Sequence, residues 1–129
     1  MNLIETLKDE HKKILELFDE VDSVDAVKEK KILVEKLKKL AIKHLTTEGK
    51  EIYPKIKEAK EKDIRDLGEL FSELMNKYST EFLNIIKKIE ESHNEIEKEI
   101  IEKYSRIKDR IKDRIVLEET TLFPAYEKL

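Results

Sequence analysis

The sequence predicts an all-α protein, one domain over residues 1–129, folded as an up-down-up-down bundle of four helices. Only two glycines and two prolines occur in 129 residues, so few residues interrupt a helix. Apolar residues recur at steps of three and four along most of the chain, which is the spacing of one helix face. Charged residues make up 44% and hydrophobic residues 39% of the chain, a balance that suits helices with one solvated and one buried face.

The first half of the chain predicts two helices, one over residues 3–21 and one from about residue 27 to Tyr53. Asn2 and Glu5 form a capping pattern at the start of the first helix. Pro54 disfavours helical backbone at the residue before it, so the second helix is expected to end there. The two apolar faces carry Ile4, Leu7, His11, Ile14, Phe18 and Val21, and then Leu33, Leu37, Leu40, His44, Glu48 and Ile52.

The second half predicts two more helices, one from about residue 64 and one ending near Pro124. Ser92 and Glu95 form a second capping box, which we take as the start of the fourth helix. No glycine or proline lies between Gly68 and Pro124, so one continuous helix in a swapped dimer is the alternative. The two apolar faces carry Leu67, Phe71, Met75, Tyr78, Phe82, Ile85 and Ile89, and then Ile96, Ile100, Ile107, Ile111, Arg114, Glu118 and Leu122.

Composition and charge exclude several classes of function. The net charge is -3 and the lysines are spread along the chain, so we expect neither nucleic acid nor a membrane as a partner. Cysteine is absent, which excludes disulfides and thiolate chemistry. No apolar run approaches the ~18 residues of a membrane span and no signal peptide is evident, so we expect a soluble, cytoplasmic protein. The abundance of lysine and glutamate is thermophile-like, although a solvated coiled coil looks similar.

Five positions on the apolar faces are polar, and they indicate a buried site. Burying several such groups costs several kcal/mol unless they pair with each other or bind a metal. The second and fourth helices each carry two of them four residues apart, so each pair points the same way from its helix. All five can converge in the middle of the bundle, where helix bundles build metal sites. The five residues are His11, His44, Glu48, Arg114 and Glu118.

A repeat connects these positions. HLTTEGKEIYP (44–54) and RIVLEETTLFP (114–124) share a frame in which a glutamate stands four residues after the first position, and an aromatic residue followed by proline closes the segment. The first and third helices repeat a spacing as well, in which His11, Ile14 and Phe18 correspond to Met75, Tyr78 and Phe82. Two half-sites are therefore expected to face each other across the bundle.

These segments resemble the hemerythrin-like (HHE cation-binding) family over nearly the whole chain. The pieces that carry the resemblance are EHKKILELF (10–18), HLTTEGKEIYP (44–54) and EETTLFP (118–124). The resemblance implies a four-helix bundle that holds two non-haem irons bridged by carboxylates. It also implies a role in oxygen binding, oxygen or nitric-oxide sensing, iron handling or iron-centre repair.

The resemblance assigns the metal ligands, and it shows where this chain departs from the family. It implies nitrogen ligands at His11 and His44 and bridging carboxylates at Glu48 and Glu118. The family would place two more histidines where this chain has Met75 and Arg114. A thioether is a poor ligand for iron, and arginine stays protonated and only donates hydrogen bonds.

Two interpretations stay open on this evidence. In the first, the four ligands hold one ion rather than two, non-haem iron or else manganese or zinc, and Arg114 bridges Glu118 and Glu48 in place of the second ion. Tyr78, one turn from Met75, could then hydrogen-bond to a bound diatomic ligand such as oxygen or nitric oxide. In the second, the polar residues form a metal-free Arg-Glu-His network in a structural or protein-binding bundle. The protein partner is unknown in either case.

The remaining conspicuous residues are expected to have ordinary roles. His93 stands 21 residues before Arg114, about 31 Å along a helix, so it is excluded from the site. Tyr53 and Phe123 are expected to pack at the end of the bundle. No nucleophile–base pair, glycine-rich loop or nucleotide motif occurs, so we do not expect a classical hydrolase, kinase or dehydrogenase. A plain helical interaction module is a third interpretation, but it leaves the double frame unexplained.

Overall fold

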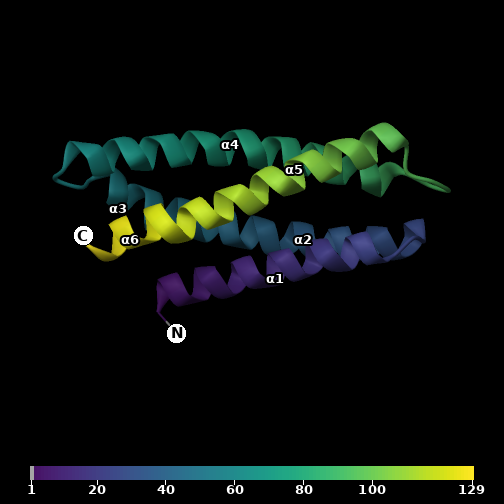
Figure 1. Ribbon diagram of the computed structural model, residues 1–129, viewed down its shortest axis with the longest axis horizontal. Coiled ribbons are helices and arrows are strands. Elements are labelled where there is room, and N and C mark those ends of the chain that lie inside the picture. The colour runs from purple at the N-terminus through teal and green to yellow at the C-terminus, as the bar shows by residue number, and fades with distance from the viewer. Residues whose placement is uncertain (1) are drawn as a thin grey trace.

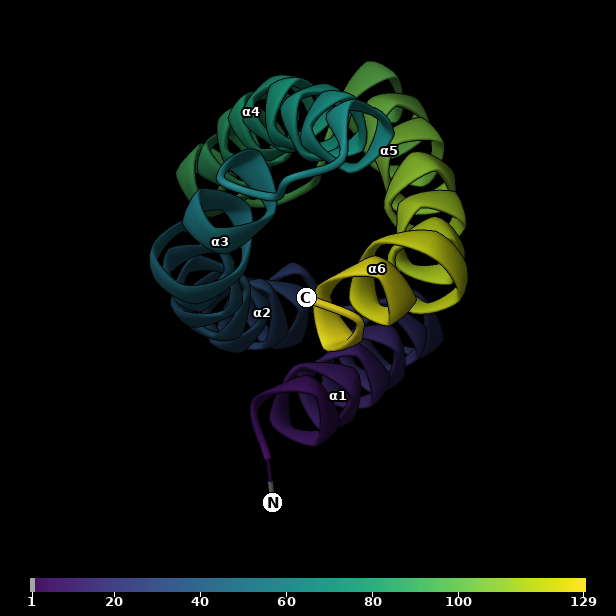
Figure 2. The same cartoon turned by 90° about the vertical axis from the view of Figure 1, so that its left-hand side faces the viewer.

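The structure is a computed structural model that describes residues 2–129, and in it the chain forms four long antiparallel helices. Figure 1 shows them running side by side, with both termini at the same end of the bundle. Figure 2, seen along the bundle, shows the four helices arranged around one centre. No strand occurs within residues 2–129, and the predicted all-α four-helix bundle is confirmed. The long helices are α1 (Leu3–Ser23), α2 (Val27–Thr47), α4 (Lys62–Glu91) and α5 (Lys98–Leu117).

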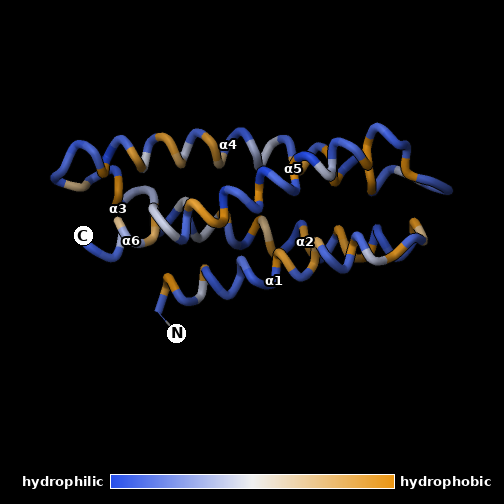
Figure 3. The backbone as a smooth tube through the Cα atoms, viewed as in Figure 1, coloured by the Kyte–Doolittle hydropathy of each residue, from blue (hydrophilic) through white to orange (hydrophobic). Residues whose placement is uncertain are grey.

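Apolar side chains form two clusters, and a polar layer lies between them. Figure 3 shows hydrophobic positions recurring at intervals along every long helix, as the spacing in the sequence predicts. Along α1, His11 stands between Leu7 of one cluster and Ile14 of the other, so the polar layer interrupts the core near its middle. The cluster near the α4–α5 loop includes Phe18, Leu37 and Phe82, and the cluster near the termini includes Ile4, Ile52 and Phe123.

The two prolines do not end their helices. Instead, a wide π-helical turn precedes each proline and the chain stays helical beyond it. In the first turn the Tyr53 N–H bonds to the Glu48 carbonyl, five residues back. Such a turn does not need the bond to residue i−4 that Pro54 cannot donate, so the predicted helix end at Pro54 was wrong. The added elements are η1 (Glu48–Ile52) and α3 (Tyr53–Lys57) after α2, and η2 (Glu118–Leu122) and α6 (Phe123–Glu127) after α5.

One of the two predicted helix caps is present. At the start of α1, the Asn2 side chain accepts a hydrogen bond of 2.9 Å from the Glu5 N–H, as predicted. Ser92, in contrast, is the C-cap of α4, and its hydroxyl donates to the Lys88 carbonyl at 2.9 Å. The predicted helix start at Ser92 was therefore wrong, since α5 begins only at Lys98. The loop between them also separates α4 from α5, so the continuous helix is not formed.

No helix within residues 2–129 is long and apolar enough to cross a membrane.

Candidate metal centre

Four buried side chains from four elements meet in the polar layer. His11 comes from α1, His44 from α2, Glu48 from η1 and Glu118 from η2. When one nitrogen or oxygen atom is taken from each side chain, the four atoms all lie within 4.8 Å of one another. Each of the four residues is at most 4% exposed. The structure thus brings together all four residues that the sequence predicts as metal ligands, and both glutamates open a π-helical turn.

A glutamate orients each histidine ring. The Nδ1 atom of His11 lies 2.8 Å from Oε2 of Glu119, and the Nδ1 atom of His44 lies 2.9 Å from Oε1 of Glu10. A carboxylate can only accept a hydrogen bond, so each Nδ1 carries a proton and donates it. Each Nε2 is then the ring nitrogen that can bind a metal once it is deprotonated, and it faces the centre. Carboxylates that orient metal-ligating histidines in this way are typical of protein metal sites.

Glu10 and Glu119 are the residues that the sequence prediction missed. Each is adjacent in sequence to a predicted ligand, His11 or Glu118, which is the one signal that singles them out. Glu10 is buried, with 5% of its surface exposed. It orients the histidine of the neighbouring helix, not the one beside it in the chain, so only the packing of α1 on α2 identifies its partner.

Three atoms that face the centre are buried and unpaired. They are Nε2 of His11, Nε2 of His44 and Oε1 of Glu48, none of which has a hydrogen-bond partner in the described part of the chain. His11 Nε2 lies 2.9 Å from Oε2 of Glu118, and His44 Nε2 contacts Oε1 of Glu48, but neither contact has hydrogen-bond geometry. Buried polar atoms are rarely left unpaired in proteins, so a missing ligand is the natural partner of these three.

The comparison with protein families matches residues 2–126 to the hemerythrin HHE cation binding domain. The chain belongs to this family. The resemblance inferred from the double frame is therefore confirmed over nearly the whole chain. Neither the comparison with curated proteins nor the comparison with solved structures found a match.

The charges of this hemerythrin-family centre are coupled. Burial alone lowers the pKa of His44, but the carboxylates of Glu48, Glu118 and Glu10 outweigh burial and raise that pKa to about 8. Burial raises the pKa of the Glu48 carboxyl, but the adjacent His44 ring brings that pKa below its usual value. Burial and the neighbouring Glu48 hold the pKa of Glu118 above its usual value. Near neutral pH the centre therefore holds a proton on His44 that a bound cation would displace.

Arg114 is buried beside the four-residue group and connects its two glutamates. Its Nε donates to Oε1 of Glu118 at 3.1 Å, and its Nη2 donates to the Tyr53 hydroxyl at 2.7 Å. The Tyr53 hydroxyl in turn donates to Oε2 of Glu48 at 3.2 Å. The sequence predicts a direct bridge from Arg114 to both glutamates, but the structure shows a direct bond to Glu118 alone. Tyr53 belongs to this network and does not merely pack at the bundle end.

The residues present fit one cation and not two. Two nitrogen and two carboxylate donors suit a divalent transition metal, and the three unpaired atoms are the ones that such an ion would bind. A second ion would need donors from the opposite half-site. There, position 114 offers a guanidinium that only donates, and position 75 offers a thioether, which is a poor ligand for iron.

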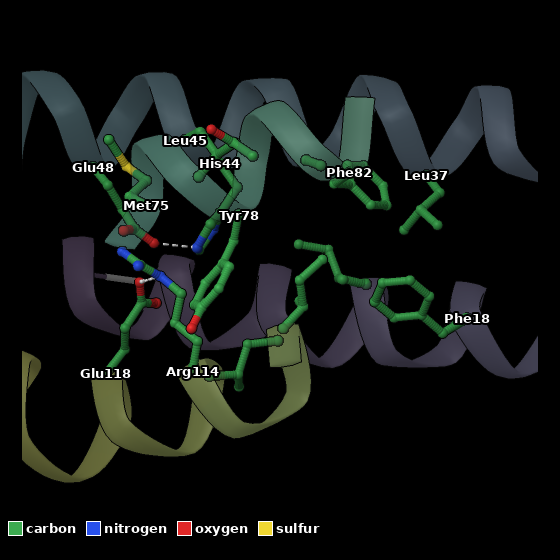
Figure 4. A pocket seen from close by; sticks show the side chains of 15 residues that line it. Phe18, Leu37, His44, Leu45, Glu48, Met75, Tyr78, Phe82, Arg114 and Glu118 are labelled. Carbon is green, nitrogen blue, oxygen red and sulfur yellow. Dashed lines mark hydrogen bonds and ion pairs between the residues drawn. The ribbon is translucent and has the colours of Figure 1, made fainter. Parts of the chain in front are cut away.

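A cavity of about 70 Å³ borders the centre. Met75 and Tyr78, both on α4 and half-buried, line it beside Arg114. Figure 4 shows polar side chains at one end of the cavity and apolar ones at the other, with Tyr78 between them. His93 is exposed and does not belong to this group. The polar end carries His44, Glu48, Arg114 and Glu118, and the apolar end carries Phe18, Leu37 and Phe82.

Proposed function

We propose that this hemerythrin-family domain binds one divalent metal ion, non-haem iron first among the candidates, through His11, His44, Glu48 and Glu118. One observation carries the proposal. The two histidines are oriented by carboxylates through Nδ1, and their buried Nε2 atoms face two buried carboxylates without any hydrogen-bond partner. A metal-free core would leave these nitrogen atoms with close carboxylate contacts that lack hydrogen-bond geometry, whereas an ion between the four residues would bind them directly.

The donor set and its surroundings limit the function. Iron, manganese and zinc all accept a mixture of imidazole and carboxylate ligands. Iron held by four protein ligands would keep coordination positions open for a small ligand such as oxygen or nitric oxide. The chain itself supplies a largely apolar cavity beside the centre that would admit such a ligand. We therefore propose a role in sensing a diatomic ligand or in handling iron, not a classical catalytic function.

A metal-free network is the second candidate, and one observation favours it. Two carboxylates, Glu48 and Glu118, face one guanidinium and one histidine whose pKa is raised to about 8. With His44 protonated, these charges balance without an ion. The protein would then be a structural or partner-binding member of the family, in which the polar layer fixes helix register.

Thermal unfolding with ferrous iron distinguishes the two candidates. The protein is melted anaerobically before and after iron is added, beside the His11→Ala variant. An ion that binds only the folded state at about 100 times its Kd adds about 2.7 kcal/mol of stability, which raises the Tm of a domain of this size by roughly 10 °C. We expect that rise in the parent protein and not in the variant. An unchanged Tm in the parent protein would favour the metal-free network.

A further inference from the structure

Arg114 has hydrogen-bonding capacity that the protein does not use. A guanidinium carries five N–H donors. Three of them are matched, by Glu118, by the Tyr53 hydroxyl and by the Phe71 carbonyl at 2.8 Å. The remaining two belong to Nη1, which is buried and has no partner. Arg114 is only 8% exposed, so bulk water does not solvate this nitrogen freely. An unmatched charged donor in such a place points to a missing acceptor.

The space for that acceptor is the cavity beside the centre. Arg114 lines this cavity together with three of the four proposed metal ligands. Its volume of about 70 Å³ is several times the roughly 10–15 Å³ that holds one water molecule, so it has room for a small molecule of a few non-hydrogen atoms. The rest of its wall is largely apolar, with Phe18, Leu37 and Phe82 at the far end (Figure 4). Among residues 2–129, Arg114 is the one residue on the wall that carries a guanidinium or ammonium group.

The charges of the layer select the sign of the ligand. The carboxylates of Glu48 and Glu118 against the guanidinium of Arg114 leave no net positive charge, even with His44 protonated, so the metal-free layer does not attract an anion. A divalent cation at the four-residue group reverses this and leaves one positive charge. Glu10 and Glu119 change this balance less, because Lys43 Nζ lies 3.7 Å from Glu10 and because Glu119 is 34% exposed on its side chain and is screened by solvent.

We propose that the cavity binds a small monoanionic oxyanion, of the size of formate or nitrite, whose oxygen accepts from Nη1 of Arg114. The proposal rests on the proposed function, because it requires a divalent cation at the neighbouring site. Charge-assisted bonds from a buried guanidinium to an oxyanion are about twice as strong as neutral hydrogen bonds. The small volume of the cavity favours a small anion.

Formate and formamide are the matched pair of probes, because each has three non-hydrogen atoms and only formate is charged. The zinc content per chain is measured first, and binding of each probe is then followed by titration calorimetry at constant ionic strength. We expect zinc-loaded protein to bind one formate, and to bind formamide at least tenfold more weakly. We expect metal-free protein not to bind formate. Equal binding of the two probes would overturn the proposal and would leave water as the partner of Nη1.

Three variants locate the anion, and the zinc content of each is measured in parallel. Arg114→Met removes the donor, and Ala41→Leu fills the cavity from α2 without removing a polar group. Either is expected to weaken formate binding at least tenfold. Ala26→Leu makes the same change at an exposed position outside the cavity and should bind formate as the parent does. Unchanged formate binding in zinc-loaded Ala41→Leu would overturn the anion site alone, whereas a parent protein that takes up no zinc would overturn the proposed function as well.

Discussion

The two halves of the molecule have the same plan and different chemistry. Each half has a long helix that points one residue at the centre, and a second helix in which a π-helical turn begins at a glutamate and ends before an aromatic residue and a proline. Both halves have the glutamate, Glu48 in the first half and Glu118 in the second. The nitrogen donors are not shared, since the first half supplies His11 and His44 where the second half supplies Met75 and Arg114.

The difference extends to the residues that orient the histidines. In the repeat, Glu10 corresponds to Leu74 and Glu119 corresponds to Gly49. Glu10 and Glu119 hold the Nδ1 atoms of the two histidines of the first half. Their counterparts, which would orient histidines at positions 114 and 75, have no carboxylate. The half-site at positions 75 and 114 therefore lacks both nitrogen donors and both supporting carboxylates, one of which would stand at position 49 in the first half. Arg114 places a fixed positive charge in this half-site.

The aromatic residues of the two frames also differ in chemistry between the halves. Phe123, in the second frame, stacks on the His11 ring with centroids 5.6 Å apart and planes 9° apart. Tyr53, in the first frame, has a hydroxyl that accepts from Arg114 and donates to Glu48. Phe123 thus presents an apolar ring face to the imidazole of His11, and Tyr53 presents a hydroxyl to the guanidinium of Arg114.

Removing a ligand from the first half should have the largest effect. We expect His44→Ala to weaken iron binding by more than about 100-fold, beyond the range typical of residues that only support a ligand. His93→Ala is the matched control, because His93 is exposed and lies outside the centre. Competition with a chelator of known affinity measures both variants. Equal iron affinity in the two variants would remove His44 from the site.

Restoring histidines to the second half should change the number of ions bound. Arg114→His is expected to raise the metal content above one ion per chain, and adding Met75→His should bring it close to two, because both missing nitrogen donors return. Arg110→His places the same residue on an exposed part of α5 and should leave the count unchanged.

The same measurement of metal content tests the supporting carboxylates. If the count stays at one in Arg114→His/Met75→His, adding Leu74→Glu and Gly49→Glu rebuilds the groups that orient the new histidines. A count of one even then would refute the claim that the half-site at positions 75 and 114 lacks only these groups.

Loss of a supporting carboxylate should have an intermediate effect. Glu10→Gln keeps the shape of the side chain but removes the charge that holds the His44 Nδ1 proton. We expect iron affinity to fall by about 10- to 100-fold, as is usual for such partners. Glu16→Gln, on the exposed side of α1, should have no effect. A fall of the same size in both variants would indicate a general effect of charge.

The pH dependence of the chelator-treated protein should be the smallest effect. The pKa of His44 is raised to about 8 from the usual 6.5, so protonated His44 stabilises the fold fully below pH 6.5. This contribution, about 1–2 kcal/mol, should be lost as pH rises through 8. Urea unfolding at pH 6.5 and pH 8.5 measures it, and His44→Gln should flatten the difference. A parent protein that gains stability over this range would contradict the charge coupling of the centre.

The bundle and the four ligand candidates could be predicted because both depend on spacing along one helix. His44 and Glu48 share a face whatever the packing, and the frame at Glu118 identifies its counterpart. Glu10 and Glu119 could not be assigned, because 30 acidic residues occur in the chain and the partner of each lies on another helix.

The other differences have local causes that a single stretch of sequence does not reveal. Ser92 forms a hydrogen bond back to Lys88, and Lys31 Nζ donates to the Ser92 carbonyl at 2.8 Å, so Ser92 closes α4 instead of opening α5. Pro54 is accommodated by a π-helical turn, which the sequence marks only through the frame that repeats at Pro124. The role of Tyr53 depends on Arg114, which comes from the other half of the chain.

The metal content per chain tests the central claim most directly. Protein purified without a histidine tag is loaded anaerobically with ferrous iron, freed of excess metal and measured by plasma mass spectrometry. The single-cation centre predicts one ion per chain, bound by the first half-site and the shared Glu118. Two ions per chain would contradict the assignment of Arg114 as the resident cation of the second half. No ion after loading would contradict metal binding altogether.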